Sequence, residues 1–243
     1  ADPTIKSAQE LMRHPAVNLL VVTGGAGVVK AAMSSGKRAI CAGPGNPPVV
    51  VDETADIEQA AKKIVEGASM DNNIICVLEK EVFVVETVAD QLIAAFERYN
   101  AVVLKSYEIE QLEKVIFKGT NGQRNPGVIN PVYIGKNIQD ILMKIGKKVE
   151  DSIKLAIAPV DVGNPLIWTE QMLPILPVAR VPNVNQAIEL AKEAEHGFRH
   201  TAMMYSKNLD NLSRMARVMD CSIFVKNGPS YAGIGHGGEG YTS

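Results

Sequence analysis

Cys76 stands alone between a polar segment and a strand-like run. The polar residues 71–73 (DNN) and the apolar pair Ile74 and Ile75 precede it, and Val, Phe and Glu residues follow. A free cysteine is most often a buried packing residue, and it can also be half of a disulfide or a metal ligand. The polar segment, however, can supply hydrogen-bond donors, and a chain reversal here would expose the sulfur. A helix N-terminus aimed at the sulfur would lower the pKa of the thiol. Packing and nucleophilic roles therefore both remain open.

The spacing of the three cysteines excludes some of these roles. Cys41, Cys76 and Cys221 form an odd set without close pairs, which argues against a disulfide scaffold and favours a reducing cytoplasm. A zinc site would show closely spaced Cys and His residues, and these cysteines have no such spacing. Cys41 and Cys221 each lie next to strand residues in apolar runs, so we interpret both as structural.

A glycine-rich segment, Thr23–Val29 (TGGAGVV), joins a predicted strand to a predicted helix. Glycines at this position let backbone amides approach an anion at the helix N-terminus, as a cofactor phosphate requires. The dinucleotide-binding fingerprint is G-x-G-x-x-G, whereas this segment reads G-G-x-G. A cofactor site and a plain tight turn are equally compatible with these residues.

Glu170 lies in LIWTEQMLPILP (166–177), between Trp168, the only tryptophan, and two prolines. This carboxylate belongs either to a surface turn or to a site where it contacts a flat cofactor or its ribose hydroxyls. His196 and His200 have the i, i+4 spacing that would begin a metal site on a helix, but no HExxH pattern or nearby cysteine accompanies them, and we predict no metal. The glycine-rich segment 233–240 (GIGHGGEG) either closes over a ligand or forms a surface connection.

The composition excludes several classes of protein. The 243 residues include 25 basic and 27 acidic side chains, for a net charge of -2, whereas a nucleic-acid-binding protein usually has a basic excess. No run of 18 apolar residues is long enough to span a membrane, and no secretion signal opens the chain. The first and last segments suggest a fragment or a domain of a longer protein.

Predicted strands and helices alternate along the chain. This alternation predicts an α/β fold with a mostly parallel sheet and helices on both faces. The Gly/Pro-rich segment 43–48 (GPGNPP) is the best candidate for a domain boundary or hinge. Residues 118–131 form a polar loop. The predicted strands are 17–25, 37–43, 49–53, 81–86, 101–105, 153–160, 173–181, 201–206 and 222–228, and the helices 5–13, 27–35, 55–69, 88–100, 108–117, 137–146, 184–195 and 209–220.

Five motifs together resemble the aldehyde dehydrogenase superfamily. Its CoA-acylating branch, the propionaldehyde and acetaldehyde dehydrogenases of propanediol and ethanolamine utilisation, is the most similar. The resemblance implies that residues 1–43 are the end of an NAD-binding domain and residues 44–243 the catalytic domain. The motifs are VTGGAGVVKAAMSSGKRAI, AGPGNPPVVVDETADIEQAAKKIVEGAS, DNNIICVLEKEVFVVE, LIWTEQMLPILPV and GIGHGGEGYTS.

The resemblance implies a role for each candidate residue. Cys76 falls where the family has its nucleophile, which attacks an aldehyde and, after hydride transfer to NAD, carries a thioester. Glu170 falls on the glutamate that holds the nicotinamide ribose, and Thr23, Gly24 and Gly25 fall on the turn beside the cofactor phosphates. The general-base glutamate of hydrolytic members is replaced by Ala42. A thiol of lower pKa than water needs less help to attack, so coenzyme A is the expected acyl acceptor.

The resemblance also concerns partners and location. Most of the NAD pocket and an oxyanion-hole asparagine would lie in an N-terminal portion that is absent here, so we expect this chain alone to have little or no dehydrogenase activity. The complete enzyme would be a cytoplasmic homo-oligomer, with a bacterial microcompartment as a further location and its shell as a further partner. Two alternatives stay open: an enzyme like gamma-glutamyl phosphate reductase, and a non-catalytic, microcompartment-associated binding module.

Overall fold

The chain divides into two units, residues up to Pro44 and residues from Gly45 on. A computed structural model describes residues 4–236. The last motif quoted above and the predicted loop 233–240 therefore lie partly outside the described residues. The boundary between the two units, after Pro44, lies within the Gly/Pro-rich segment 43–48, which the sequence analysis gave as the best candidate for a domain boundary or hinge.

The first unit is a βαβ unit with one preceding helix. Thr4 caps the first helix by accepting a hydrogen bond from the Ser7 backbone amide. The two strands pair in parallel, with Leu19 opposite Arg38, and a helix connects them. The predicted strand–glycine turn–helix–strand order is confirmed. Its elements are α1 (Ile5–Arg13), β1 (Leu19–Thr23), α2 (Ala26–Met33) and β2 (Arg38–Ala42).

The second unit is built on a seven-stranded sheet in which every neighbouring pair is parallel. Its strand order is β11-β10-β3-β4-β9-β8-β5. The predicted α/β fold with a mostly parallel sheet is therefore confirmed. The strands are β3 (Pro48–Val51), β4 (Glu81–Val85), β5 (Ala101–Val103), β8 (Leu155–Pro159), β9 (Ile175–Val181), β10 (Thr201–Tyr205) and β11 (Ile223–Lys226).

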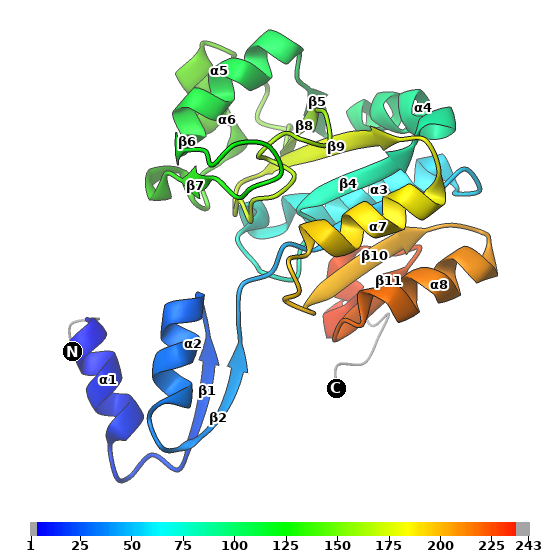
Figure 1. Cartoon of the computed structure of the whole chain (residues 1–243). Coiled ribbons are helices and arrows are strands. Elements are labelled where there is room, and N and C mark those ends of the chain that lie inside the picture. The colour runs from blue at the N-terminus through cyan, green and yellow to red at the C-terminus, as the bar shows by residue number, and fades with distance from the viewer. Residues whose placement is uncertain (1–3, 237–243) are drawn as a thin grey trace. The chain divides into compact units, whose positions relative to one another are not determined.

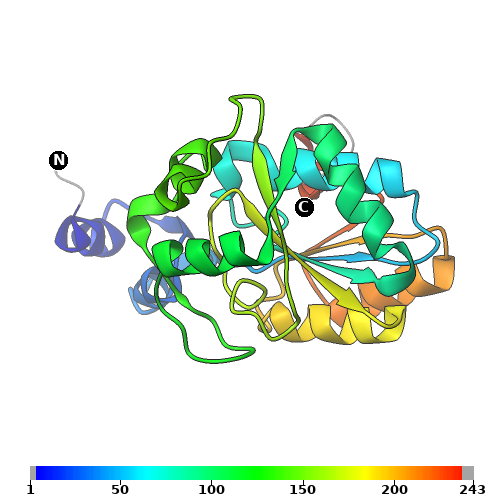
Figure 2. The ribbon, with the colours of Figure 1, turned by 90° about the horizontal axis from the view of Figure 1, so that it is seen from above.

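Helices cover both faces of this sheet (Figures 1 and 2). Successive side chains of a strand point to opposite faces, so Val49 and Val51 pack with α3 and α4, whereas Val50 packs with α7 and α8. Helices α5 and α6 bury a third cluster against β8. No helix in the described part of the chain is long and apolar enough to cross a membrane. The helices are α3 (Ile57–Ser69), α4 (Glu86–Phe96), α5 (Ser106–Ile116), α6 (Ile138–Leu142), α7 (Val184–Ala194) and α8 (Leu209–Met219).

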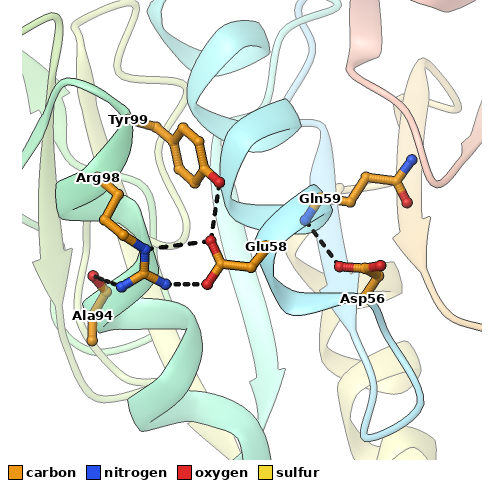
Figure 3. Close-up of polar contacts among 6 residues, drawn as sticks. All are labelled: Asp56, Glu58, Gln59, Ala94, Arg98 and Tyr99. Atoms are coloured by element: carbon orange, nitrogen blue, oxygen red, sulfur yellow. Dashed lines mark hydrogen bonds and ion pairs between the residues drawn. The ribbon is translucent and has the colours of Figure 1, made fainter.

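The start of α3 is tied to the turn after α4 (Figure 3). Asp56 caps α3 by accepting a hydrogen bond from the Gln59 backbone amide at 3.1 Å. The next acidic residue, Glu58, pairs with Arg98 and accepts a hydrogen bond from the Tyr99 hydroxyl at 3.0 Å. The Arg98 hydrogen bond is the main reason that the pKa of Glu58 is lowered. These contacts fix the position of α3, the helix that leads into Cys76.

Two local predictions were wrong. The segment 118–131, expected to be a loop, contains most of a short antiparallel pair, β6 (Phe117–Gly119) and β7 (Val128–Ile129). Strands of two or three residues are too short to give an alternating pattern, so the sequence carries no signal for them. The helix expected over 137–146 ends at Leu142 and continues as a 3₁₀ turn, which Gly146 closes at a φ of 75°.

Candidate active site

Four neighbouring strands place chemically active residues at one edge of the sheet. β10, β3, β4 and β9 are adjacent and parallel, so their amino ends meet at the same edge. A polar or reactive residue precedes three of these strands directly or within a few residues, and a glycine precedes the fourth. These residues are His200 before β10, Gly45 before β3, Cys76 and Lys80 before β4, and Glu170 before β9.

Gly45 is the point at which three of these loops touch. Its backbone amide donates a hydrogen bond to Glu170 Oε1 at 3.3 Å. A Cβ at this position would lie 2.6 Å from the Cys76 carbonyl oxygen and 3.1 Å from two carbons of the His200 ring. Cys76, Glu170 and His200 therefore surround the same residue, although they are far apart in the sequence.

We expect Gly45→Ala to destabilise the chain by about 1–3 kcal/mol, because the new methyl group would push against backbone rather than a flexible side chain. The Cys76 loop would have to move, so the rate at which iodoacetamide alkylates Cys76 should change as well. Urea unfolding and mass spectrometry measure the two effects. Gly43→Ala is the matched control, since a Cβ there meets no atom within 4 Å. Equal stability of the two variants would contradict this packing.

Cys76 is half-buried, and all three cysteines are free. Burial raises the pKa of its thiol, the negative charge of Glu170 raises it further, and the positive charge of Lys80 opposes them. The expectation that a helix N-terminus lowers this pKa is wrong, because a turn and then β4 follow Cys76 rather than a helix. The thiol is therefore neutral at pH 7 in this chain and must lose its proton before it can act as a nucleophile.

The turn before Cys76 has an unusual backbone. Asp71, Asn72 and Asn73 have φ values of 46°, 52° and 62°, in the left-handed region. Asp and Asn tolerate this region better than other residues with a side chain, which explains why these residue types occupy positions 71–73. Asn72 Nδ2 donates hydrogen bonds to Gly135 O and Asn137 Oδ1 at 3.0 and 2.9 Å. The buried Asn73 donates to Ala68 O at 2.7 Å and to Glu79 O at 2.9 Å, so the turn is held on both sides.

Glu170 faces this turn from the loop before β9. It is half-buried rather than on an open surface turn, and burial raises its pKa, while the Gly45 amide and the charge of Lys80 lower it. The buried Trp168 anchors the loop by donating its Nε1–H to Val162 O at 2.7 Å. Gln171 Nε2 donates to Lys80 O at 3.2 Å and so connects the Glu170 loop to the segment between Cys76 and β4.

The sequence analysis missed His200 as a site residue. Helix α7 ends at Ala194, so His196 and His200 do not lie on one helix and their i, i+4 spacing does not place them on one helical face. His196 bonds to Trp168 O at 2.8 Å, whereas His200 Nδ1 lies 2.9 Å from Thr201 Oγ1. Burial and the charge of Lys80 lower the pKa of His200, so its imidazole is neutral at pH 7 and can accept a proton. The described residues contain no group of three potential metal ligands.

The glycine turn belongs to the first unit. β1 ends at Thr23, the Gly24 amide donates to Ala42 O at 3.2 Å, and α2 begins directly after Gly25. Gly24 has a φ of 151°, a conformation that side chains rarely adopt. A Cβ at Gly25 or Gly27 would meet no atom within 4 Å, so space remains at the start of α2. The segment has the strand–turn–helix shape that an anion site requires.

Comparison with known proteins identifies the family. A sequence model of the aldehyde dehydrogenase family matches residues 3–108, which include Cys76. Acetaldehyde dehydrogenase (acetylating) EutE of Salmonella typhimurium is 49% identical over the whole of this chain. The chain belongs to the aldehyde dehydrogenase family. The family expected from the sequence is thus confirmed, and the chain spans about half the length of the curated relatives it matches, 52% for this one.

Two solved structures of similar aldehyde dehydrogenases extend the comparison to the fold. Propionaldehyde dehydrogenase of Rhodopseudomonas palustris with bound propionyl-CoA has a TM-score of 0.93 and 46% identity, covering 100% of this chain and 52% of that one. A propionaldehyde dehydrogenase from the Clostridium phytofermentans fucose utilisation bacterial microcompartment has a TM-score of 0.91 and 39% identity, covering 100% and 54%. The fold of this aldehyde dehydrogenase chain is therefore that of CoA-acylating members.

Proposed function

We propose that this chain is the catalytic part of a CoA-acylating aldehyde dehydrogenase, which oxidises a short-chain aldehyde with NAD and coenzyme A to an acyl-CoA. The observation that carries the proposal is the convergence of Cys76, Glu170 and His200 around Gly45. Similarity over the whole of this chain to an acetylating acetaldehyde dehydrogenase supports the reaction class, and so does similarity to an enzyme with bound propionyl-CoA. Acetaldehyde and propionaldehyde are the proposed substrates.

Cys76 would carry the acyl group through the reaction. Its thiol loses a proton, and the imidazole of His200, which lies beside Gly45 as the Cys76 carbonyl does, is a group that can take it. The thiolate adds to the aldehyde carbonyl to form a thiohemiacetal. A bound NAD would supply the hydride acceptor for this adduct, and Cys76 would then hold the acyl group as a thioester. The thiol of coenzyme A then attacks the thioester carbonyl, and acyl-CoA leaves as the Cys76 thiolate is restored.

Two sets of residues would bind the cofactor in this proposal. Glu170 would accept hydrogen bonds from the nicotinamide ribose hydroxyls, since its carboxylate is half-buried and held by the Gly45 amide. Thr23, Gly24 and Gly25 would lie beside the cofactor phosphates, and the open space at the start of α2 supports this role. Residues 1–43 would then belong to the NAD-binding domain and residues 44–243 to the catalytic domain.

Coenzyme A, rather than water, is the proposed acyl acceptor. Ala42 stands where the family resemblance puts the general base of hydrolytic members, so that position offers no carboxylate to activate water. A thiol needs less activation than water because its pKa is lower. The names of the similar enzymes favour this branch over gamma-glutamyl phosphate reductase and over a non-catalytic module.

Assembly and location also belong to this proposal. A propionaldehyde dehydrogenase with 39% identity comes from a bacterial microcompartment, which supports the cytoplasm, and a microcompartment within it, as the place where the complete enzyme acts. The shell of that compartment would be a partner. The complete enzyme would be a homo-oligomer.

A steady-state assay tests the function. An enzyme of the relatives' full length that contains this chain should reduce NAD continuously with acetaldehyde or propionaldehyde only when coenzyme A is present, and without it should reduce no more than one NAD per Cys76 thioester formed. Equal rates with and without coenzyme A would contradict the acyl-acceptor proposal. The 243-residue chain alone should be nearly inactive, because a missing oxyanion-hole donor alone costs about 3 kcal/mol, or 10²–10³ in rate. NAD-dependent acyl-CoA formation by the chain alone would contradict that expectation.

A further inference from the structure

Lys80 is a buried lysine whose side-chain hydrogen bonds, among the described residues, all go to the segment directly before Cys76. Its side chain is fully buried at the entrance to β4. The ammonium nitrogen donates to Asn73 O at 2.7 Å, to Asn73 Oδ1, and to Ile75 O at 3.2 Å. An ammonium group has three N–H donors, so these three oxygens use all of them.

Burying the Lys80 ammonium group costs free energy, so other interactions must offset this cost. Lysine is almost never fully buried unless it is paired, and burial lowers the pKa of Lys80 to about 8. Neighbouring carboxylates offset this effect only in part, and no carboxylate lies within ion-pair distance among the described residues. The lysine is therefore bound by the backbone and the amide of the turn rather than by a counterion.

The turn needs such a group because its backbone is strained. Three consecutive residues, Asp71, Asn72 and Asn73, occupy the left-handed region, which costs free energy at each position. The Lys80 ammonium bonds to the last of these residues twice and to Ile75, the residue directly before the cysteine. Loss of these bonds would release the segment that positions the thiol.

We propose that Lys80 is a positioning residue for Cys76: its ammonium group fixes the left-handed turn that presents the sulfur, and its positive charge favours the thiolate. This role rests on the proposed function, because it assumes that Cys76 is the nucleophile. Lys80 is fully buried, and in this proposal it acts through the cysteine.

The charges around Cys76 explain why a cation is needed there. Burial and the carboxylate of Glu170 both disfavour the thiolate, and a backbone hydrogen bond at Cys76 and the positive charge of Lys80 oppose them. The other titratable groups that face Lys80 are Glu79 and Glu81, its neighbours in the chain, and His200. Burial raises the pKa of both glutamates, which reduces their negative charge and leaves the ammonium available to the thiolate.

The test measures alkylation of Cys76 by iodoacetamide in the 243-residue chain, from pH 6 to 10, by mass spectrometry of the peptide that contains it. We expect Lys80→Met to lower the rate about tenfold at pH 7.5, where the Lys80 ammonium still carries most of its proton, and to have a smaller effect above pH 9, where it has lost that proton. Amide hydrogen exchange should become faster in residues 70–76. Lys80→Gln, which keeps N–H donors without the charge, should lower the rate at pH 7.5 with a smaller change in exchange.

The control is Lys147→Met, which removes a lysine paired with Glu108 at 2.7 Å in another part of the unit. It should leave the Cys76 rate and exchange unchanged. A Lys80→Met chain that stays folded and shows the wild-type rate at pH 7.5 and the wild-type exchange would overturn the proposal. A wild-type Cys76 that fails to react at any pH would contradict the proposed function instead, and the exchange result would still decide the positioning role.

A measurement on the unmodified chain covers the case in which the Lys80 variants do not fold. The rate of alkylation by anionic iodoacetate, divided by that by neutral iodoacetamide, reports the charge near each thiol. At Cys76 this ratio should fall as the pH rises through about 8, where the Lys80 ammonium loses its proton. Cys221, whose pKa burial raises to about 11, is the internal comparison. A ratio at Cys76 that stays constant from pH 7 to 9.5 would overturn the proposal.

Discussion

Replacing Cys76 by alanine is expected to lower acyl-CoA formation by an enzyme of the relatives' full length more than about 10³-fold, since no other group can carry the thioester. The alternatives among the cysteines are poor. Cys221 packs against a core cluster and donates its S–H to Ile223 O at 3.0 Å, and Cys41 lies in a strand of the first unit. The measurement is the steady-state rate with propionaldehyde, NAD and coenzyme A.

The matched control for this prediction is Cys221→Ala. It removes a thiol of the same unit and should leave the rate within about twofold. Thermal unfolding of both variants separates a chemical effect from a loss of fold. Substantial activity in a folded Cys76→Ala enzyme would mean that the acyl group is carried elsewhere.

Substituting Glu79 by glutamine is expected to raise the free energy of unfolding at pH 8 by about 3 kcal/mol. Glu79 is fully buried, and it accepts hydrogen bonds from the Ser230 amide and hydroxyl at 2.8 and 2.7 Å. Burial nevertheless raises its pKa from 4.5 to about 7, against the effect of those two bonds.

The sign of the pH dependence follows from this shift. The folded chain holds the Glu79 proton more tightly than the unfolded chain does. The contribution of the protonated Glu79 to the free energy of unfolding is therefore fully present below about pH 4.5 and is lost as the pH rises to about 7. Glutamine resembles the neutral acid at every pH, so the two chains should be similarly stable at pH 5 and differ at pH 8. Urea unfolding at both values measures this, with the exposed Glu189→Gln as control. A difference that does not change between pH 5 and 8 would contradict the prediction.

The architecture was predictable because strands and helices are long enough to leave a pattern. The apolar face expected for the helix over 55–69 is the buried face of α3. The alternation of strands and helices along the chain predicted a parallel sheet, and the seven-stranded sheet of the second unit is parallel. The short pair β6–β7 was missed because its contacts are set by tertiary packing, in which Phe117 closes over Gly127.

The candidate site was only partly predictable. Cys76 and Glu170 were recognised one at a time, from local residue types. Their proximity depends on the strand order, in which β4 lies between β3 and β9, and no local pattern encodes that order. His200 precedes β10 as Cys76 precedes β4, so its place before a strand was an available signal. Lys80 had none, because a lysine between two glutamates (EKE) looks like a solvated surface and yet is buried.

The location of the site at the amino ends of the strands is itself informative. Open parallel sheets commonly bind ligands at the carboxyl ends of their strands. Here the loops that enter β3, β4, β9 and β10 carry the reactive groups, and Gly45 allows them to approach closely. The strained turn before Cys76 and the buried Lys80 both belong to this edge.

The most direct test of the central claim is to trap the acyl group on the sulfur. An enzyme of the relatives' full length that contains this chain would be mixed with propionaldehyde and NAD without coenzyme A, quenched in acid and digested with trypsin. A propionyl group should appear on the peptide Ile64–Lys80, whose only cysteine is Cys76, and should disappear when coenzyme A is added before quenching. NAD reduction with this peptide unmodified, or with the propionyl group on the peptide of Cys41 or Cys221, would contradict the account.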